Sequence, residues 1–258
     1  MKIGVFLPAS SPADVPAAAR FAEQAGLDSV WSVDHLIASG PILDSTVALA
    51  AAAGVTERIT LGYGVMLLAL RRVAVAAKQV STLQLVSGGR LALGVGTGNP
   101  AHGDPGWRAA GMSFGDRGRR TDQALSRLPA LVTGQRATIE DGQDVTLEPG
   151  SAMPPVLVAG DGPRARRRAA EFGDGWIALA QDPGAVAAGL ADLRERAVAL
   201  GRPVPSATVV APALDGSVAR AARRLAEYAA AGTERVVLAP TGEDWRHDYS
   251  FAADLHAA

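Results

Sequence analysis

The chain has 258 residues, of which 48% are hydrophobic and 20% charged, and its 25 basic and 26 acidic residues give a formal net charge of -1. This balance is typical of a globular protein and provides no long-range field to attract nucleic acid or an anionic membrane. The lack of cysteine excludes disulfides and thiolate nucleophiles, and no apolar stretch reaches the ~18 residues of a membrane helix. We therefore expect a cytoplasmic protein that binds neither nucleic acid nor a membrane.

Short apolar segments alternate with alanine-rich segments of helical spacing along the chain. The first half contains predicted strands at residues 2–7, 29–33, 59–65 and 91–95, separated by helices at 13–24, 45–55 and 73–86. The second half contains strands at 156–159, 176–179, 208–211 and 235–239, each followed by a helix, at 164–172, 185–200, 218–231 and the chain terminus. These strands lack polar alternation, which is typical of parallel strands buried on both faces.

An irregular segment at about 104–155 separates the two halves. It begins with a glycine-rich, loop-like stretch at 104–118, continues with a helix at 119–132 and includes a short strand-like run at 145–147. About eight βα units predict an α/β fold, a single-domain (β/α)8 TIM barrel over residues 1–258, in preference to a doubly wound open sheet. Polar residues that follow the strands are the first candidates for a functional site, because such barrels place their sites there.

Two adjacent polar residues, Asp34 and His35, follow the second strand. A histidine at this position is suited to proton transfer near neutral pH, beside a carboxylate that can accept hydrogen bonds. The pair also has a structural interpretation, in which Asp34 caps the following segment and His35 is a hydrogen-bonded scaffold residue. Its location at a strand end favours the catalytic interpretation.

Glycine-rich turns follow the fourth and fifth strands. Gly94, Gly96 and Gly98 would let a flat ring or a phosphate approach the backbone, or would serve only a tight corner of the barrel. The turn Gly160-Asp161-Gly162-Pro163 leads into a helix whose free N–H groups and positive dipole end suit a phosphate, with an ordinary turn as the alternative. The arginines that open this helix either reach a polyanion or form a solvated face; they are Arg164, Arg166, Arg167 and Arg168.

Two large side chains of the irregular segment, Trp107 and Met112, either line a pocket for an apolar substrate or cover one end of the barrel core. No cysteine cluster and no carboxylate–histidine spacing predicts a metal site.

Four stretches resemble the luciferase-like monooxygenase superfamily, also called bacterial-luciferase-like. They are GLDSVWSVDHL at 26–36, TERITLGYGV at 56–65, SGGRLALGVGTG at 87–98 and EFGDGW at 171–176. The resemblance covers nearly the whole chain and implies an oxidoreductase with a TIM-barrel fold, commonly a homodimer. It also implies a flavin-type cofactor beside Asp34 and His35, with His35 as the proton donor or substrate orienter.

The superfamily divides between enzymes that use FMN and enzymes that use the deazaflavin coenzyme F(420), and Asp34-His35 is similar to the deazaflavin branch. The resemblance therefore favours hydride transfer between coenzyme F(420) and a small organic substrate. Two alternatives stay open. One is an FMN-dependent two-component monooxygenase that receives reduced flavin from a partner reductase, and the other is a non-catalytic barrel that only binds a cofactor.

Further cofactor contacts are implied by the resemblance. A non-prolyl cis peptide is expected around Gly64-Val65, followed by Leu67; the turn from Gly160 to Pro163 matches the family's phosphate loop; and the residues after the fourth strand are Gly98, Asn99 and His102. Deazaflavin-dependent sugar-phosphate dehydrogenases carry an acidic residue where this chain has Asn99, and His102 stands at a later asparagine position. That particular activity is therefore not expected.

Overall fold

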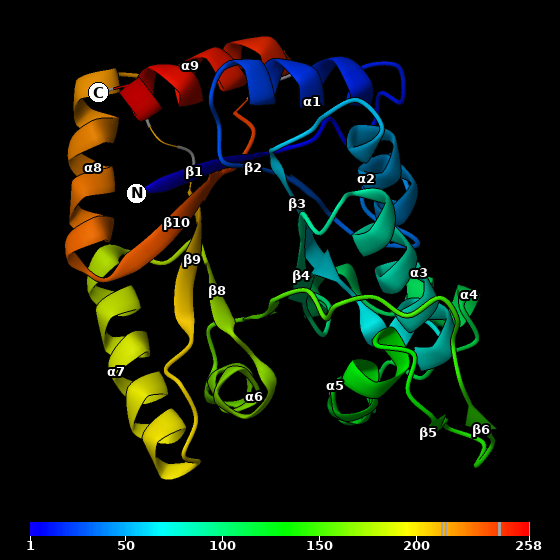
Figure 1. Ribbon diagram of the computed structural model, residues 1–258. Helices are drawn as coiled ribbons and strands as arrows, with labels where there is room; N and C mark the ends of the chain where they lie inside the picture. Colours follow the sequence, from blue (N-terminus) through cyan, green and yellow to red (C-terminus); the bar gives the residue numbers. More distant parts are fainter. Residues whose placement is uncertain (213, 215, 242–243, 258) are drawn as a thin grey trace.

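Eight parallel strands close into a barrel, in the order β1-β10-β9-β8-β7-β4-β3-β2 (Figure 1). The structure is a computed structural model and describes residues 1–212, 214, 216–241 and 244–257, apart from the side chain of His102. The eight strands are those predicted from the sequence, so the (β/α)8 barrel is confirmed. Their bounds are β1 Lys2–Phe6, β2 Ser29–Ser32, β3 Thr60–Met66, β4 Leu91–Val95, β7 Val156–Ala159, β8 Gly175–Leu179, β9 Ser206–Ala211 and β10 Thr233–Leu238.

A helix follows each barrel strand, and the helices form a layer around the barrel (Figure 1). Pro163 opens α6 and Pro183 opens α7, where the missing N–H costs nothing, and the Asp182 side chain accepts a hydrogen bond from Ala185 N to cap α7. The bounds of these helices are α1 Val15–Gln24, α2 Ser45–Ala53, α3 Val73–Val86, α5 Arg117–Val132, α6 Pro163–Phe172, α7 Pro183–Ala199, α8 Val218–Ala230 and α9 Trp245–Ala257.

The irregular segment corrects two sequence predictions. The stretch expected as a loop contains the short helix α4 (Pro105–Ala109), because Pro105 can occupy the first turn of a helix. The strand expected at 145–147 is shorter and lies outside the barrel. It is β6 (Asp144–Val145), which pairs antiparallel with β5 (Ala137–Thr138). Two short 3-10 turns, η1 (Leu68–Leu70) and η2 (Pro100–His102), follow β3 and β4.

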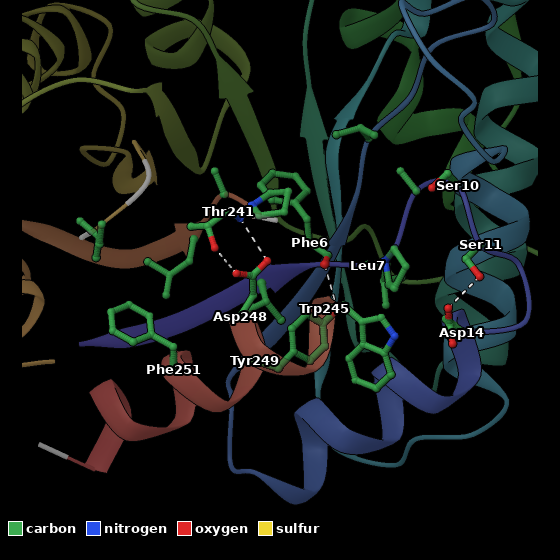
Figure 2. A pocket seen from close by; sticks show the side chains of 18 residues that line it. Phe6, Leu7, Ser10, Ser11, Asp14, Thr241, Trp245, Asp248, Tyr249 and Phe251 are labelled. Atoms are coloured by element: carbon green, nitrogen blue, oxygen red, sulfur yellow. Dashed lines mark hydrogen bonds between the residues drawn. The ribbon is translucent and has the colours of Figure 1, made fainter. Parts of the chain in front are cut away.

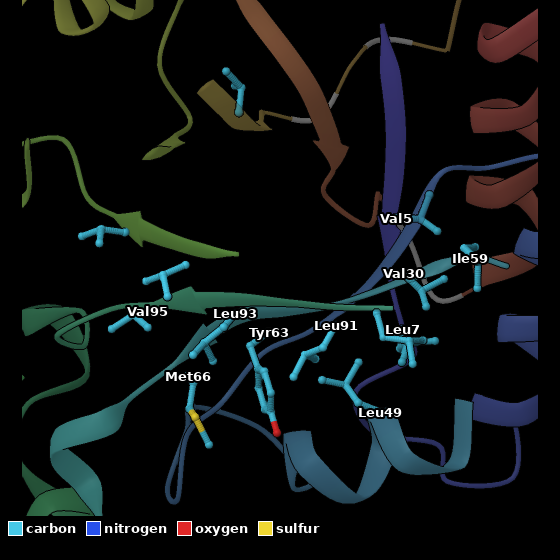
Figure 3. Packing of buried hydrophobic residues seen from close by; sticks show 14 of the residues in the cluster. Val5, Leu7, Val30, Leu49, Ile59, Tyr63, Met66, Leu91, Leu93 and Val95 are labelled. Atoms are coloured by element: carbon cyan, nitrogen blue, oxygen red, sulfur yellow. The ribbon is translucent and has the colours of Figure 1, made fainter. Parts of the chain in front are cut away.

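Buried apolar side chains pack on both sides of the sheet. The larger cluster fills the space between strands and helices, where Leu49 of α2 lies beside Leu91 of β4 (Figure 3). A smaller cluster fills the barrel interior and contains Trp31, Ala92, Leu157, Ala159, Ile177 and Val237. Burial on both faces explains why the strands are continuously apolar in sequence. None of the helices in the described ranges has the length and apolar character that crossing a membrane requires.

Candidate active site at the carboxyl ends of the strands

A cavity of about 510 Å³, here called the central cavity, opens where the carboxyl ends of the strands meet. Of the site residues predicted from the sequence, it brings together His35, Gly64, Val65, Leu67, Gly98, Asn99, Gly160 and Asp161. Asp34, Gly162 and Pro163 lie outside its lining, and the side chain of His102 lies outside the described residues. The predicted residues therefore separate into a set that faces the cavity and a set that lies behind or beside it.

Asp34 is nearly fully buried, and its carboxylate faces away from the central cavity into a cluster of donors. Arg71 donates from both terminal nitrogens, at 2.7 Å and 3.1 Å, Leu67 N donates at 2.8 Å and Ser45 Oγ donates at 3.1 Å. Burial by itself lowers the pKa of Arg71, but the hydrogen bonds and charge of Asp34 outweigh burial and hold that pKa above its usual value. Asp34 therefore fixes the backbone of Leu67, which lines the cavity.

Unlike Asp34, the neighbouring titratable side chain of His35 lines the central cavity. It follows Asp34 directly and is half-buried. Because Asp34 is fixed to Arg71 and Leu67, the backbone that carries His35 is held in place at the cavity wall. A half-buried imidazole at this position can hold or transfer a proton at the face of a bound ring or substrate.

The peptide bond between Gly64 and Val65 is cis, at the position that the resemblance implies. The pairing of β3 with β4 shifts register between Tyr63 and Met66, which marks a bulge at the same place. Gly64 and Val65 consequently face the cavity together with Leu67.

Gly94 in the fourth strand and Gly96 just after it allow close packing against this bulge. A methyl group at Gly94 would lie 2.0 Å from Tyr63 O, and one at Gly96 would lie 2.4 Å from Val65 Cγ2. Only glycine lets β4 approach the bulge so closely. The tight-corner interpretation thus accounts for both residues, although Gly96 also lines the cavity with Thr97, Gly98 and Asn99.

The turn after β7 is fixed by three hydrogen bonds to the neighbouring strand β8. Gly160 N donates to Ile177 O at 3.1 Å, Trp176 Nε1 donates to Gly160 O at 2.7 Å, and Leu179 N donates to Asp161 Oδ1 at 2.9 Å. Gly160 has φ +126, and a methyl group there would lie 2.9 Å from Ala165 Cβ, so glycine is required. The Asp161 carboxylate is thereby tied to β8, and the first turn of α6 begins at the rim of the cavity.

Three of the four arginines that open α6 are engaged in ion pairs. Arg166 pairs with Asp192, and Arg167 and Arg168 both pair with Asp122. Arg164 is exposed and makes no hydrogen bond or ion pair with any residue of the described ranges. Three of these arginines therefore form ion pairs that hold the helix in place. Arg164 is the one arginine of this helix turn that pairs with no described residue.

Several residues that line the cavity were not predicted from the sequence. They are Trp31, Thr97, Pro100, Ala159, Ile177, Leu179, Thr208, Val210 and Val237. Most of them look like ordinary buried strand residues in the sequence. They can be identified only when the strands are known to form a closed barrel, because alternate residues of each strand then face the interior. Trp107 packs instead with Leu67 and Leu70 in a small cluster beside the cavity and does not line it. No group of three or more potential metal ligands occurs within the described ranges.

A closed (β/α)8 barrel with a cavity at the carboxyl ends of its strands defines the TIM-barrel class, which carries its functional sites at those ends. The sequence profile of the luciferase-like monooxygenase family matches residues 1–257. The chain therefore belongs to this family, as the resemblance predicted.

Comparisons with individual proteins agree on the fold. The chain is 36% identical to an F(420)-dependent glucose-6-phosphate dehydrogenase of Beutenbergia cavernae, over 65% of this chain and 52% of the relative. The coenzyme F(420)-dependent tetrahydromethanopterin reductase of Methanopyrus kandleri superposes with a TM-score of 0.78 at 17% identity, covering 98% of this chain and 97% of that one. A monooxygenase of Streptomyces bottropensis superposes with a TM-score of 0.79 at 23% identity and full coverage of both chains, 100% and 100%. The chain spans about half the length of the curated relatives it matches.

Proposed function

We propose that this protein is a single-domain, coenzyme F(420)-dependent oxidoreductase that transfers hydride between the deazaflavin and a small organic substrate. The central cavity, with His35 in its wall and the first turn of α6 at its rim, is the observation that carries this proposal. The similarity to the Beutenbergia cavernae enzyme supports the deazaflavin over FMN. Neither the sugar-phosphate substrate of that enzyme nor its direction of reaction is extended to this chain.

The residues present fit a bound deazaflavin. Val65 and Leu67 on one side and Ile177 and Val210 on the other give the cavity apolar surfaces suited to a flat ring system. The volume of about 510 Å³ lies within the range of small-molecule sites. The cofactor, when bound, supplies or accepts the hydride, and the protein contributes binding, orientation and proton transfer.

His35 is proposed to hold or move the proton that accompanies the hydride. His35 would accept the hydroxyl proton when an alcohol substrate is oxidised and would return a proton when a carbonyl substrate is reduced. Asp34 acts as a positioning residue in this proposal, because its carboxylate contacts Arg71, Ser45 and Leu67 N and does not line the cavity. Gly64, Val65, Leu67, Gly98 and Asn99 form the wall against the ring.

The first turn of α6 is proposed to bind the phosphate of the cofactor. Gly162 is the N-cap of α6 and Pro163 its first residue, so this turn directs N–H groups and the positive dipole end toward the rim. Gly160 and Asp161 shape the approach, and Arg164 adds an unpaired positive charge.

Substitution at Gly162 tests the phosphate site. The space around a side chain at Gly162 is open and its φ is -83, so Gly162→Asp should fold and even cap α6. Its charge would nevertheless oppose a phosphate, and we expect cofactor affinity to fall about tenfold or more. Gly162→Ala adds the Cβ without the charge and is the matched control. Equal affinities for the two variants would remove the phosphate site.

Turnover tests the function itself. Purified protein with coenzyme F(420) and a panel of secondary alcohols should bleach the visible absorbance of the oxidised cofactor, and His35→Ala should not. Oxygen-dependent turnover with reduced FMN and a flavin reductase would instead support the two-component monooxygenase. Binding of cofactor without turnover of any substrate would support the non-catalytic barrel.

A homodimer is also proposed, through the outer faces of α2 and α3. These packed helices expose Val47 on α2 and Val75 and Val86 on α3, which are 68%, 52% and 61% exposed. Light scattering should give a molar mass twice that of one chain, and Val47→Glu should lower the measured mass toward that of the monomer. The cytoplasmic location stays a prediction from the sequence.

A further inference from the structure

A second cavity, here called the β1–β10 cavity, lies at the carboxyl ends of β1 and β10 and against α9 (Figure 2). Its volume is about 590 Å³, larger than that of the central cavity. Four aromatic side chains line it, and Figure 2 shows them around one space; they are Phe6, Trp245, Tyr249 and Phe251. Leu7, Leu238 and Pro240 add aliphatic surface.

The polar groups around this cavity are largely committed to one another. Tyr249 Oη donates to Phe6 O at 2.8 Å, and Ser11 Oγ donates to Asp14 Oδ2 at 2.7 Å. The Asp248 carboxylate accepts from the backbone N–H of Thr241 at 3.1 Å and from its hydroxyl. These internal bonds, drawn in Figure 2, leave mainly apolar surface for a ligand.

The charges at this cavity exclude an anionic ligand. Asp14 and Asp248 line it, and no lysine or arginine does so among the described residues. The residues outside the described ranges add no lysine or arginine by sequence, being alanine, aspartate, glycine and glutamate. A phosphate or carboxylate bound here would lie between two acidic side chains without a counter-charge, which burial makes costly.

The two cavities adjoin at Phe6. The Phe6 ring lines the β1–β10 cavity, and its Cε1 would lie 2.9 Å from a methyl group at Gly64, a residue that lines the central cavity. Adjacent residues of β10 face the two spaces as well, Val237 the central cavity and Leu238 the β1–β10 cavity. A molecule in the second cavity is therefore separated by one side-chain layer from the wall of the first.

We propose that the β1–β10 cavity is the substrate pocket, and that it takes an uncharged, mainly apolar alcohol or carbonyl compound, with the Phe6 side chain as the partition that moves to join the two cavities. This inference rests on the proposed function, because only a cofactor in the central cavity makes the neighbouring space a substrate pocket. It distinguishes this chain from relatives named for a phosphorylated sugar.

Binding of two isosteric probes tests the charge preference. Cyclohexyl methyl ketone and cyclohexanecarboxylate differ only by a methyl group in place of a charged oxygen, and the corresponding primary amine supplies the cationic case. Binding is followed by NMR, as a shift of the indole N–H resonance of Trp245. The chain has four tryptophans, and this resonance is assigned by its loss in Trp245→Phe. Trp107 does not line the β1–β10 cavity, and its signal serves as the internal control.

We expect the ketone to shift the Trp245 signal saturably and the carboxylate to bind at least about tenfold more weakly. Ser10→Arg, at an exposed position on the rim, should strengthen carboxylate binding severalfold and leave ketone binding unchanged, whereas Ser10→Ala should change neither. Equal or tighter binding of the carboxylate or the amine to the unmodified protein would overturn the proposed substrate class.

A second measurement, of the fluorescence of bound coenzyme F(420), distinguishes the proposed function from the proposed substrate pocket. With coenzyme F(420) bound, the ketone should also change the cofactor fluorescence, because Phe6 contacts both spaces. A ketone that shifts Trp245 but never affects bound cofactor would refute the substrate pocket. Failure of the protein to bind coenzyme F(420), with ketone binding intact, would refute the proposed function and with it the substrate role of the β1–β10 cavity, and would leave only a binding site for uncharged ligands.

Discussion

Arg90 and Glu23 at the base of the barrel differ in their surroundings from His35 and Thr97 at its mouth. At the amino end, Arg90 donates five hydrogen bonds to groups of residues 53–59 and to Ser87 O, and Glu23 accepts from the backbone N–H groups of Glu57, Arg58 and Ile59. At the carboxyl end, His35 and Thr97 line a cavity instead, and Arg164 of α6 is unpaired. Arg90 and Glu23 at the base therefore hold loop backbone in place, whereas His35 and Thr97 at the mouth line the central cavity.

The comparison predicts that substitutions at the mouth change function and that substitutions at the base change stability. His35→Ala should have the largest effect. Loss of a proton-transfer group lowers turnover about 100-fold or more, whereas cofactor affinity should stay within about twofold. Steady-state rates and fluorescence titration measure the two quantities. His247→Ala, an exposed histidine of α9, is the control and should behave like the unmodified protein. An equal loss in both variants would contradict the role of His35.

Arg90→Ala should have the largest effect at the base. It removes five hydrogen bonds and leaves buried carbonyls without a donor, so the free energy of unfolding should fall by about 3 kcal/mol. Urea unfolding measures the change. Arg58→Ala, at an exposed neighbouring position, should cost less than about 0.5 kcal/mol. Cofactor affinity lost in Arg90→Ala under conditions where it is folded would break the separation between base and mouth.

Arg164→Ala should have a smaller effect at the mouth. Removing the unpaired charge should weaken cofactor binding by about fivefold at low salt, and less at high salt. Arg167→Ala, whose charge is engaged by Asp122 and Glu171, should leave cofactor affinity unchanged. An equal loss of cofactor affinity in both variants would contradict the claim that the unpaired charge of Arg164 contributes specifically to cofactor binding.

Glu23→Gln should have the smallest effect, and one that depends on pH. Burial raises the pKa of Glu23, but three backbone hydrogen bonds outweigh burial and hold the pKa below its ordinary value of 4.5. The carboxylate therefore contributes stability that is fully present above pH 4.5 and is lost as the pH falls through the lowered pKa. Unfolding at neutral pH should show a deficit for Glu23→Gln that shrinks below pH 4.5. A deficit independent of pH would mean that the charge has no part in it.

The sequence predicts the framework of the barrel better than the assembly of its mouth. Eight apolar runs locate the strands because each is buried on both faces, and the turn at Gly160 follows from glycines before Pro163. The partner of Asp34 lies 37 residues away, and no local pattern connects Asp34 with Arg71. The strand residues that face the cavity, such as Thr208, require knowledge of barrel closure. The β1–β10 cavity joins residues from the two ends of the chain and has no sequence signal at all.

The proposed function depends on binding of the deazaflavin by the central cavity and the first turn of α6. Parallel titrations of the purified protein with coenzyme F(420) and with FMN, followed by fluorescence quenching, test it most directly. We expect saturable binding of coenzyme F(420), weaker binding of FMN, and an affinity for coenzyme F(420) that falls about tenfold or more in Gly162→Asp but not in Gly162→Ala. Tight FMN binding without a response to coenzyme F(420) would contradict it.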